Sequence, residues 1–383
     1  MSDSPSVFFF AGEASGDAHG AALIEALRRL RPDVRCLGAG GPRMQAAGQE
    51  QLYDLTEHAV VGLVEVLRHY PRLRGLFNQA VRAVKKAQPE AVVFIDYPGF
   101  NLRLAKALRR AAPKTKLIFF ISPQVWAWKS GRAKTMARLL DRLLVIFPFE
   151  KEWFAQHAPS LPVEWVGHPI WDRMLVQERE GDSGPVRRVA LLPGSRQGEI
   201  RKHLPILLEA ARHLYEKRRD LRFVWLAPDA KAQRLGLEIL KDYPGGPPIE
   251  AYVGYPLSHM SRCGLALLAS GTVSLECACV GVPQIVFYKV HPLTYLIGRM
   301  VVKIPFVSMV NILAGKEIIP EMIQAGLTPE SLANRAENLL DDEGLRAAMR
   351  GQMAEAVAKL GPPGAGERAA RSVLAEIGAA PAA

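Results

Sequence analysis

Two short stretches in the second half of the chain combine glycine, small hydroxyl residues and charge in a way that suits phosphate binding. In the first, "ALLPGSRQGEIRKHLP" (190–205), an apolar run ends at Gly194, Ser195 and Arg196, and an amphipathic helix follows. Free backbone N–H groups at a helix start attract anions, glycine permits close approach, and a guanidinium can bind two phosphate oxygens. An ordinary strand-to-helix turn with a solvated arginine is the alternative for this stretch alone.

The second stretch, "LLASGTVSLE" (267–276), offers Ser270, Gly271 and Thr272 as small donors at another expected helix start. Glu276 lies one turn further on, where a carboxylate can accept hydrogen bonds from two ribose hydroxyls. A helix N-cap followed by a helix-favouring glutamate would look the same. Two such loops in one half of the chain nevertheless favour a nucleotide whose diphosphate lies between two helix starts.

The opening stretch, "FFFAGEASGDAHG" (8–20), is a third glycine-rich segment with polar side chains. It lacks the G-x-G-x-x-G of a dinucleotide site and the Lys-Ser/Thr of a P-loop. Because neither spacing is present, a nucleotide-phosphate role is not assigned to it. We expect a loop here, with these residues available to a ligand: Gly12, Glu13, Ser15, Gly16, Asp17 and His19.

A candidate general base follows an apolar run in "FIDYPGFN" (94–101), where Asp96 precedes the turn formers Pro98 and Gly99. A carboxylate at the carboxyl end of a parallel strand points toward the ligand-binding edge of a sheet. A turn-capping aspartate is the alternative. His19 is a rival base because imidazole titrates near neutral pH, and His168 in "VGHP" is expected to be structural or to line the site.

The elements that must position these residues alternate between short apolar runs and amphipathic segments. This alternation predicts an α/β fold with two Rossmann-like, doubly wound parallel sheets. The expected strands are 7–10, 34–37, 91–95, 116–121, 143–147, 163–166, 188–192, 223–226, 251–253, 265–269 and 284–287, and the clearest helices are 21–30, 199–217 and 368–377.

A length of 383 residues suggests two domains. The polar, glycine-containing stretch 177–186 is typical of a linker, so we expect domains at 1–176 and 187–360. The second hinge, 361–367, leads to a terminal segment, 367–383, that is expected to pack back on the first domain. The strand-end loops of both domains would then face one cleft.

The chain is basic, with 49 Lys and Arg against 38 Asp and Glu, a net charge of +11. This balance suits an anionic partner, although it can also serve solubility alone. The basic residues are scattered and no nucleic-acid module is recognised, so nucleic acid is not expected. The four cysteines show no metal-ligand spacing and suit a reducing compartment. The N-terminus lacks the features of a signal peptide, and turn residues interrupt the apolar stretch 263–288, which favours a buried segment over a membrane span.

Nine stretches, in this order, resemble the lipid-A-disaccharide synthase family of two-domain GT-B glycosyltransferases. The last departs slightly, because the family usually has proline where this chain has Val310. The stretches are "GEASGD" (12–17), "GGPRMQAAG" (40–48), "FIDYPGFN" (94–101), "SPQVWAWKSGR" (122–132), "FPFEKEWF" (147–154), "VGHP" (166–169), "LLPGSR" (191–196), "ASGTVSLE" (269–276) and "VSMVNILAGKE" (307–317).

The resemblance implies transfer of 2,3-diacylglucosamine from its UDP conjugate to the 6-hydroxyl of 2,3-diacylglucosamine 1-phosphate. The product is a β-1,6-linked disaccharide 1-phosphate of lipid A biosynthesis, formed with inversion, and inversion requires one general base on the acceptor hydroxyl. The chain has no D-x-D sequence, so neither a metal nor another cofactor is expected.

The resemblance also implies site residues. Asp96 would be the base, with Glu13 and Ser15 beside it in the catalytic set. The acceptor side would hold Gly12, Gly16, Asp17, His19 and Asn101, and the UDP would be bound by Gly194, Ser195, Arg196, Ser270, Gly271, Thr272, Glu276 and Asn311.

Acylated substrates require contact with a membrane, so the resemblance implies a cytoplasmic enzyme bound peripherally to the inner membrane. Segments 64–86 and 285–306 mix basic and apolar residues and could bind an anionic surface. Core-facing amphipathic helices are the alternative for both. The oligomeric state is left open, with a homodimer as one option.

Three other functions compete with this reading. The first is another UDP-sugar transferase of the same architecture, such as the one that builds the peptidoglycan lipid intermediate, although its opening differs from "GEASGD". The second is a nucleotide-binding regulatory protein without turnover. The third is a dinucleotide oxidoreductase, which the missing G-x-G-x-x-G disfavours.

Overall fold

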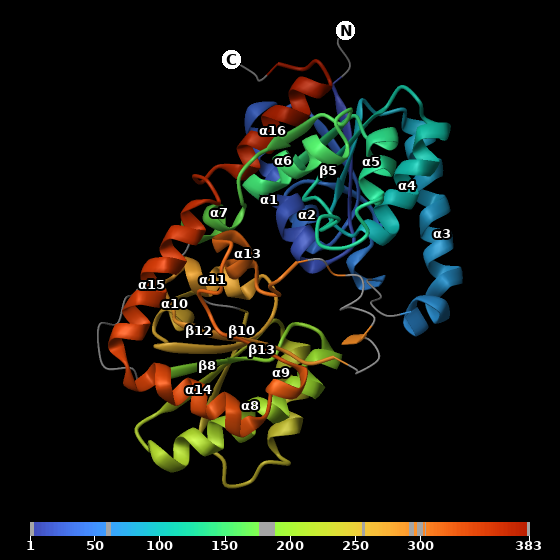
Figure 1. Cartoon of the computed structure of the whole chain (residues 1–383). Helices are drawn as coiled ribbons and strands as arrows, with labels where there is room; N and C mark the ends of the chain where they lie inside the picture. The colour runs from blue at the N-terminus through green and yellow to red at the C-terminus, as the bar shows by residue number, and fades with distance from the viewer. Residues whose placement is uncertain are drawn as a thin grey trace. The chain divides into compact units, whose positions relative to one another are not determined.

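The computed structural model describes residues 4–58, 63–175, 188–254, 257–290, 295, 296, 302 and 304–380, with the backbone alone at 58, 63–70, 175 and 257. The chain forms two compact units (Figure 1). Unit 1 comprises Met1–Asp172 and Leu360–Ala383, and unit 2 comprises Arg173–Lys359. The expected linker, 177–186, lies outside the described residues. The chain therefore leaves unit 1 once and returns to it with its last segment.

Unit 1 contains a seven-stranded sheet in the order β3-β2-β1-β4-β5-β6-β7. Every pairing in it is parallel. Runs of buried aromatic and β-branched residues build the central strands, as expected for a sheet covered on both faces. The strands are β1 Ser6–Ala11, β2 Arg35–Gly40, β3 Glu50–Asp54, β4 Ala91–Ile95, β5 Lys116–Phe120, β6 Arg142–Val145 and β7 Val163–Trp165.

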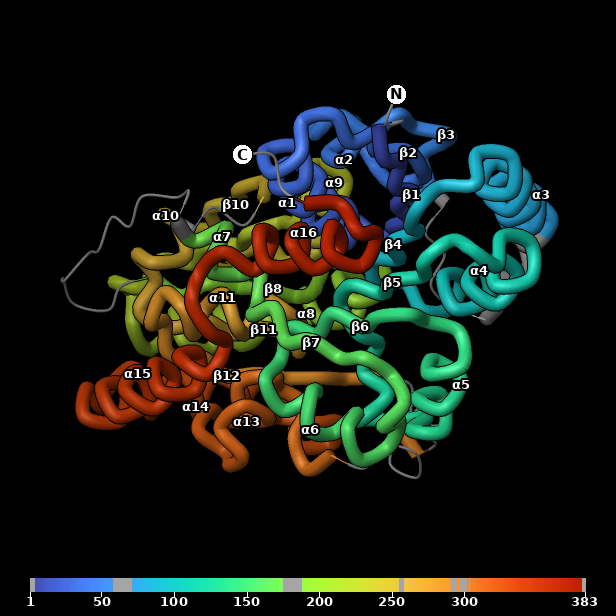
Figure 2. Tube along the Cα trace, turned by 90° about the horizontal axis from the view of Figure 1, so that it is seen from above, coloured from blue at the N-terminus to red at the C-terminus, as the bar shows by residue number. Residues whose placement is uncertain are grey.

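The helices of unit 1 pack on a core in which Phe8, Phe10, Phe94 and Phe119 are buried on neighbouring strands. The C-terminal helix α16 lies along α1, as Figure 2 shows from above. The helices are α1 Ala14–Leu30, α2 Pro42–Ala46, α3 Leu63–Ala87, α4 Pro98–Ala111, α5 Arg132–Leu139, α6 Pro148–His157 and α16 Ala365–Glu376; α7, Ile170–Leu175, contains the boundary with unit 2.

Unit 2 contains a six-stranded sheet in the order β10-β9-β8-β11-β12-β13, again with every pairing parallel. Its strands are β8 Arg188–Leu192, β9 Arg222–Ala227, β10 Ile249–Val253, β11 Leu265–Ala269, β12 Gln284–Tyr288 and β13 Glu321–Ile323. Its helices include α8 Gln197–Lys217, α9 Ala230–Leu240, α10 Leu257–Ser261, α11 Val273–Cys279, α13 Met309–Ala314, α14 Pro329–Asp341 and α15 Glu343–Ala358.

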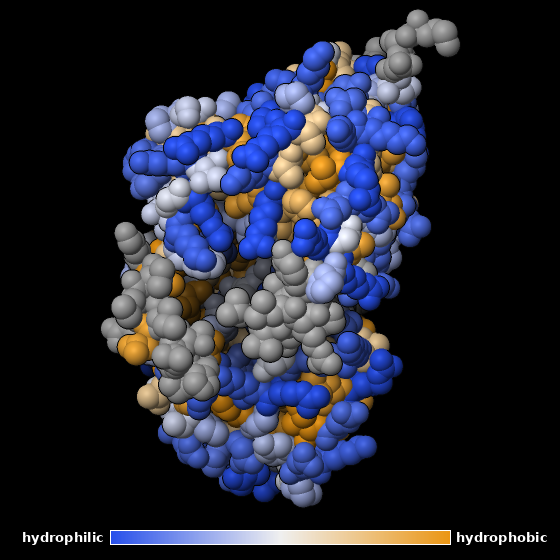
Figure 3. Space-filling model, turned by 90° about the vertical axis from the view of Figure 1, so that its right-hand side faces the viewer, coloured by the Kyte–Doolittle hydropathy of each residue, from blue (hydrophilic) through white to orange (hydrophobic). Residues whose placement is uncertain are grey.

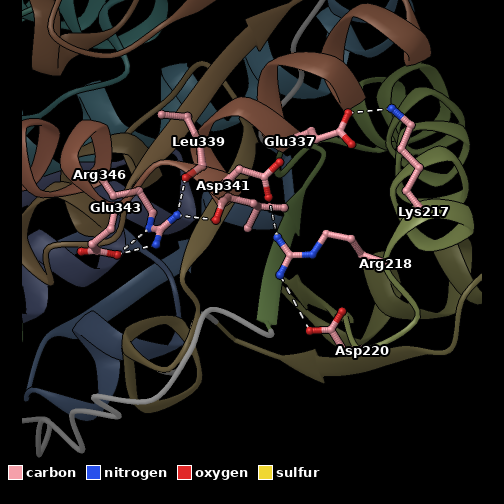
Figure 4. A network of polar contacts seen from close by, with 9 residues as sticks. Lys217, Arg218, Asp220, Glu337, Leu339, Asp341, Glu343 and Arg346 are labelled. Carbon is pink, nitrogen blue, oxygen red and sulfur yellow. Dashed lines mark hydrogen bonds and ion pairs between the residues drawn. The ribbon is translucent and has the colours of Figure 1, made fainter.

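Ion pairs join the helical layer of unit 2 at one end (Figure 4). Lys217 at the end of α8 pairs with Glu337 of α14 at 2.6 Å, and Arg218 pairs with Asp341 at 3.1 Å. The guanidinium of Arg346 donates to the carbonyl oxygens that end α14, and it also pairs with Glu343. These contacts fix α8, α14 and α15 relative to one another, and α8 is the helix that follows the Pro-Gly-Ser-Arg turn.

The predicted fold class is confirmed, and every predicted strand is present with small shifts at its ends. Two strands were not predicted: β3 (Glu50–Asp54) and β13 (Glu321–Ile323), which are short and half-buried. The predicted helix 21–30 was wrong at its start, because α1 begins at Ala14 and takes in most of the expected opening loop. The segment 64–86 lies within the continuous helix α3, which contains Pro71 in its interior.

The apolar stretch 263–288 forms β11, α11 and β12, so it contributes two strands to the core of unit 2. Within the described ranges, no helix is both long enough and apolar enough to cross a membrane.

Candidate functional site

The strand order of unit 1 reverses between β1 and β4, the position at which α/β sheets bind ligands beyond the carboxyl ends of their strands. Ala11 and Ile95 are register partners at the last position of these two strands. The chain continues from β1 into Gly12 and Glu13, and from β4 into Asp96. The fold therefore brings the "GEASGD" and "FIDYPGFN" segments to one edge of one sheet.

The backbone is strained at this edge. Asp96 and Tyr97 follow β4 with φ of 47° and 48°, and Ile121 follows β5 with φ of 65°. Left-handed φ values are uncommon for residues other than glycine, and a β-branched residue there is an outlier. Such conformations cost about 1–3 kcal/mol each and cluster at functional sites. The half-buried Asp96 is thus held in an unfavourable conformation at the position where a ligand is expected.

Gly12 makes this arrangement possible. A Cβ atom at residue 12 would lie 2.2 Å from Cδ1 of Tyr97, well inside van der Waals contact. Only glycine therefore allows the Tyr97 ring to lie over the loop, where it also stacks on Phe100 at 6.1 Å. The first loop supports the second directly, next to Asp96.

Two of the predicted acceptor-side residues stabilise this edge of the sheet through buried hydrogen bonds. The carboxylate of Asp17 is buried and accepts hydrogen bonds from the N–H groups of Gly41, Arg43 and Met44 at 2.8–3.0 Å. The side-chain amide of Asn101 is also buried. Its Nδ2 donates to the carbonyl oxygens of Phe10, Ile95 and Asp96 at 2.8–3.3 Å. Asp17 thus fixes the start of α2, and Asn101 ties the ends of β1 and β4 to each other.

The other predicted residues of the opening segment belong to α1 rather than to a loop. Ser15, Gly16 and His19 lie in its first two turns, with Ser15 exposed and His19 half-buried. Glu13, the N-cap residue, is half-buried between the end of β1 and this helix. Of this group, Ser15 is exposed, and it lies in the first turn of α1 directly after the end of β1.

In unit 2 the strand order reverses between β8 and β11, where Leu192 and Leu268 are register partners. The chain continues from β8 into Gly194–Arg196 and from β11 into Ser270–Thr272. Gly271 and Thr272 are exposed, and the hydroxyl of Ser270 donates to the carbonyl oxygen of Val307 at 2.8 Å. The two predicted phosphate loops therefore lie side by side at the edge where a Rossmann-like sheet binds its ligand.

A carboxylate of the protein itself occupies the start of α8. Oε2 of Glu199 accepts from the N–H of Ser195 at 3.1 Å and from that of Arg196 at 3.3 Å. Its Oε1 accepts from the Arg196 guanidinium at 3.1 Å. Gly194 has φ of 115°, and a Cβ there would lie 2.5 Å from Oε2 of Glu199. The turn thus binds a negatively charged oxygen pair through the donors that the sequence assigns to phosphate.

A buried histidine supports this turn. The ring nitrogens of His203 lie 2.8 Å from the carbonyl oxygen of Pro193 and 3.1 Å from that of Lys289. The ring also packs edge-on against Phe287 of β12. His203 therefore fixes the first residue of the turn against the segment that follows β12.

Glu276 is buried on α11 and pairs with Arg173 through Oε1. Its other oxygen, Oε2, is buried without a hydrogen-bond partner among the described residues. Leaving a buried polar atom unpaired costs free energy, so such an atom calls for an explanation. An acceptor without its donor at the predicted ribose position suits a hydroxyl group of a ligand.

Asn311 lies on α13 and is fully buried. Its Nδ2 donates to the carbonyl oxygen of Ile319 and to Glu321, and its Oδ1 accepts from the N–H groups of Ile318 and Ile319. All four distances are 2.8–3.0 Å. The amide is thus engaged within unit 2, as a support for the segment between α13 and β13.

His168 and Glu150 lie deeper in unit 1. Nδ1 of His168 accepts from the N–H of Ile170, and the ring packs on Phe147. Glu150 is buried, which raises the pKa of its carboxyl to about 7, and it accepts from the indole N–H of Trp126 and from the start of α6. These contacts give structural roles to the "VGHP" and "FPFEKEWF" motifs.

Sequence reasoning missed Glu199 and Arg173, which contact predicted residues directly. Glu199 lies three residues after Arg196, which is the spacing of a capping box at a helix start, and that signal could have identified it. Arg173 lies about a hundred residues before its partner, and no local pattern marks it.

A groove of about 910 Å³ lies elsewhere in unit 2, between α8 and the loop after α9. Arg201, Glu209, Arg212 and Tyr243 are among its lining residues, and none of the predicted site residues is. Within the described ranges, no group of three or more His, Cys, Asp or Glu side chains is placed to hold a metal ion.

Comparison with known proteins gives a consistent result. The lipid-A-disaccharide synthetase family matches residues 7–374. A lipid-A-disaccharide synthase from Geobacter sulfurreducens is 38% identical over 389 aligned residues, covering 97% of each chain. Among solved structures, the calicheamicin glycosyltransferase CalG4 superposes with a TM-score of 0.59 at 16% identity, covering 99% of each chain. The UDP-GlcNAc 2-epimerase of Methanocaldococcus jannaschii, solved with UDP-GlcNAc and UDP, gives 0.61 at 15% identity, covering 97% of this chain and 99% of the other.

Proposed function

The chain belongs to the lipid-A-disaccharide synthase family of GT-B glycosyltransferases, and on this premise we propose its substrates, its stereochemistry and the role of each site residue. The donor is UDP-2,3-diacylglucosamine and the acceptor is 2,3-diacylglucosamine 1-phosphate. Attack by the acceptor 6-hydroxyl gives the β-1,6-linked disaccharide 1-phosphate and UDP. Because the donor sugar is α-linked, the reaction proceeds with inversion.

One observation carries this proposal: each sheet presents its predicted residues at its own reversal of strand order. Ser195, Arg196 and the 270–272 loop then bind the diphosphate, and Glu276 accepts from the ribose through its unpartnered Oε2. The fixed N–H dipoles at the start of α8 and the Arg196 guanidinium stabilise the charge that develops on the leaving UDP.

In unit 1, Asp96 accepts the proton of the acceptor 6-hydroxyl while Glu13 and Ser15 orient the sugar. A general base must lie within hydrogen-bond reach of the proton that it removes, and the strained turn at 96–97, at the ligand-binding edge of the sheet, supports this role for Asp96. Gly12, Asp17 and Asn101 position this edge rather than contact the reacting atoms. Asn311 supports the donor region from within unit 2.

The decisive experiment is UDP release with the diacylated donor and acceptor in detergent. The wild-type protein should release UDP only when both substrates are present, and the product should carry a β-1,6 linkage by NMR. UDP release at background level, with an active family member as the control, would contradict the proposal. A product with retained anomeric configuration would contradict inversion alone.

We further propose that the acylated substrates are reached at the cytoplasmic face of the inner membrane. Helix α3 supports this with two faces: Ala80 and Val84 are buried in the core, whereas Arg72, Arg74 and Arg82 are exposed. Figure 3 shows that hydrophilic side chains predominate on the face in view. Exposed cations near an anionic bilayer contribute about 1 kcal/mol each. The side chains of Arg68 and Tyr70, together with Arg299 and Lys303, lie outside those described.

Replacing Glu199 by glutamine should strengthen UDP binding about five- to tenfold. In the free protein the Glu199 carboxylate occupies the N–H groups and the guanidinium that the diphosphate needs, so the two anions compete. Glutamine removes the charge but still suits the third position of the helix. Isothermal titration with UDP measures the change.

Glu209→Gln is the matched control, because Glu209 lies on the same helix and pairs with Arg212 away from the turn. UDP affinity should stay unchanged in that variant. Weaker UDP binding by Glu199→Gln would show that the glutamate orders the turn for the nucleotide instead of competing with it.

A further inference from the structure

The loop between β5 and α5, residues 121–131, contains two tryptophans with opposite surroundings. Trp126 is buried, donates its indole N–H to Glu150 at 3.1 Å and packs edge-on against Phe149. Trp128 is 43% exposed. A large exposed aromatic side chain next to an anchored one needs a reason, because burying its apolar surface would have been favourable. The first tryptophan anchors the loop, whereas the second is exposed.

Two cations gather on this exposed indole. Nζ of Lys129 lies 4.3 Å from the centroid of the Trp128 ring, and Cζ of Arg132 lies 5.7 Å from it. No carboxylate among the described residues pairs with either cation. Attraction to the ring face holds both charges near one point, although like charges repel. An anion bound there would relieve that repulsion.

The backbone favours an anion at the same place. Lys129 has φ of 58°, in the left-handed region, which is unfavourable for a residue other than glycine and is frequent at functional sites. Helix α5 starts directly afterwards with Gly131 as its N-cap, which offers no capping side chain, and its first turn contains no acidic residue. The positive end of the helix dipole is therefore uncompensated.

The fold places this loop beside the proposed base. β5 is the neighbour of β4, Ile95 and Phe120 are register partners, and the N–H of Asp96 donates to the carbonyl oxygen of Phe120. The loop leaves the sheet at Ile121, one residue beyond that contact. Trp128, Lys129 and Arg132 therefore belong to the segment next to Asp96 at one edge of one sheet.

We propose that Lys129 and Arg132, held on the Trp128 ring, form a binding site for the phosphate monoester of the acceptor sugar; this rests on the proposed function. A phosphate monoester carries between one and a half and two negative charges at neutral pH, and two cations match it better than they match the single charge of a phosphodiester headgroup. The indole supplies an apolar surface beside it. The cluster thereby sets the acceptor's phosphate at a fixed distance from the base at Asp96.

The test compares two acceptors, 2,3-diacylglucosamine 1-phosphate and its dephosphorylated form, by direct binding in detergent and by turnover. The wild type should bind the phosphorylated form at least about tenfold more tightly. In the double variant Lys129→Ala/Arg132→Ala this preference should fall to about one, with the donor KM unchanged within twofold. Lys134→Ala/Arg138→Ala, which removes two exposed cations from α5, is the control and should keep the preference.

Two results separate this inference from the proposed function. If the wild type binds the phosphorylated acceptor selectively but releases no UDP, the phosphate site at Lys129 and Arg132 is supported and the proposed reaction is wrong. If it turns over both acceptors equally well, the proposed glycosyl transfer is supported and the phosphate site at Lys129 and Arg132 is wrong. A double variant that keeps the full phosphate preference also overturns the inference.

A vesicle arm distinguishes the acceptor phosphate from bulk lipid headgroups. Sedimentation with phosphatidylglycerol vesicles should fall equally in the Lys129/Arg132 and Lys134/Arg138 double variants, because each loses two charges. A larger loss for Lys129/Arg132 together with an unchanged acceptor preference would assign the cluster to the membrane surface and overturn the inference.

Discussion

Replacing Asp96 by asparagine is expected to lower kcat at least about a hundredfold, which corresponds to about 2.7 kcal/mol of lost transition-state stabilisation. The amide has the shape of the carboxylate but cannot accept the proton of the acceptor hydroxyl. Asparagine also tolerates the left-handed backbone that residue 96 adopts, with φ of 47°. The strand end and the Tyr97 ring should therefore stay in place, and the loss should be chemical. Single-turnover UDP release with both substrates saturating measures it.

Two controls make this prediction specific. UDP affinity should be unchanged, because the residues proposed to bind the nucleotide lie in unit 2, and the thermal transition should move by less than about 2 °C. His19→Gln should lower kcat by less than tenfold, since His19 lies in the second turn of α1 rather than at the strand end. Near-normal turnover in Asp96→Asn with a large loss in His19→Gln would transfer the role of base to the histidine.

The central strands could be predicted well from the sequence, because a continuous run of hydrophobic residues marks each of them. The run 91–95 is continuous and apolar, as a strand buried on both faces requires, and its predicted bounds match β4. The edge strands β3 and β13 were missed because their half-buried sequences, "EQLYD" and "EMI", carry no such run. Their pairing with β2 and β12 comes from long-range contacts that a local window does not contain.

The start of α1 was missed for a different reason. Three glycines and several short polar residues between 12 and 20 predict a loop by local propensity, yet the helix begins at Ala14. Gly20 shows why a residue of low helix propensity lies in this helix. A Cβ atom at position 20 would lie 2.5 Å from the sulfur of Met44 and 2.8 Å from Cδ1 of Ile95. Close packing of α1 on β4 and α2 requires glycine at that position, so packing outweighs its low helix propensity.

At the candidate site, the sequence identified residues by type but could not separate those that face a ligand from those that support the fold. Asp17 and Asn101 carry polar groups at the right spacing, but backbone groups engage the Asp17 carboxylate and the Nδ2 of Asn101, whose Oδ1 is buried without a hydrogen-bond partner among the described residues. Those partners lie up to 91 residues away. Glu276 kept an unpartnered oxygen, which no pattern of residue types reveals.

Asn311→Ala is expected to destabilise unit 2 by about 3 kcal/mol or more, the second large effect. The substitution leaves the N–H groups of Ile318 and Ile319 and the carbonyl oxygen of Ile319 buried without their present partner. Each unsatisfied buried group costs about 1–3 kcal/mol. For a unit of this size the melting transition should fall by roughly 6–12 °C. Differential scanning calorimetry measures it.

The surroundings make this loss hard to repair. The N–H of Val310 donates to Ser308, and Glu321 accepts from the N–H groups of Val307 and Ser308 as well as from Asn311. The amide therefore joins the start of α13 to the segment before β13, and the hydroxyl of Ser270 donates to the same Val307 at the second phosphate loop. The substitution Asn311→Ala should consequently displace the 270–272 loop and raise the donor KM. This increase should accompany the loss of stability.

That coupling distinguishes support from direct contact with the donor. Asn334→Ala on the exposed face of α14 should change stability by less than about 0.5 kcal/mol and leave the donor KM unchanged. The donor KM of Asn311→Ala is measured at temperatures where this variant is fully folded. If Asn311 only supports the 270–272 loop, the increase in donor KM should become smaller on cooling, because the loop regains its position. A donor KM raised tenfold or more at every temperature, with an unchanged melting transition, would instead place the Asn311 amide on the UDP-sugar.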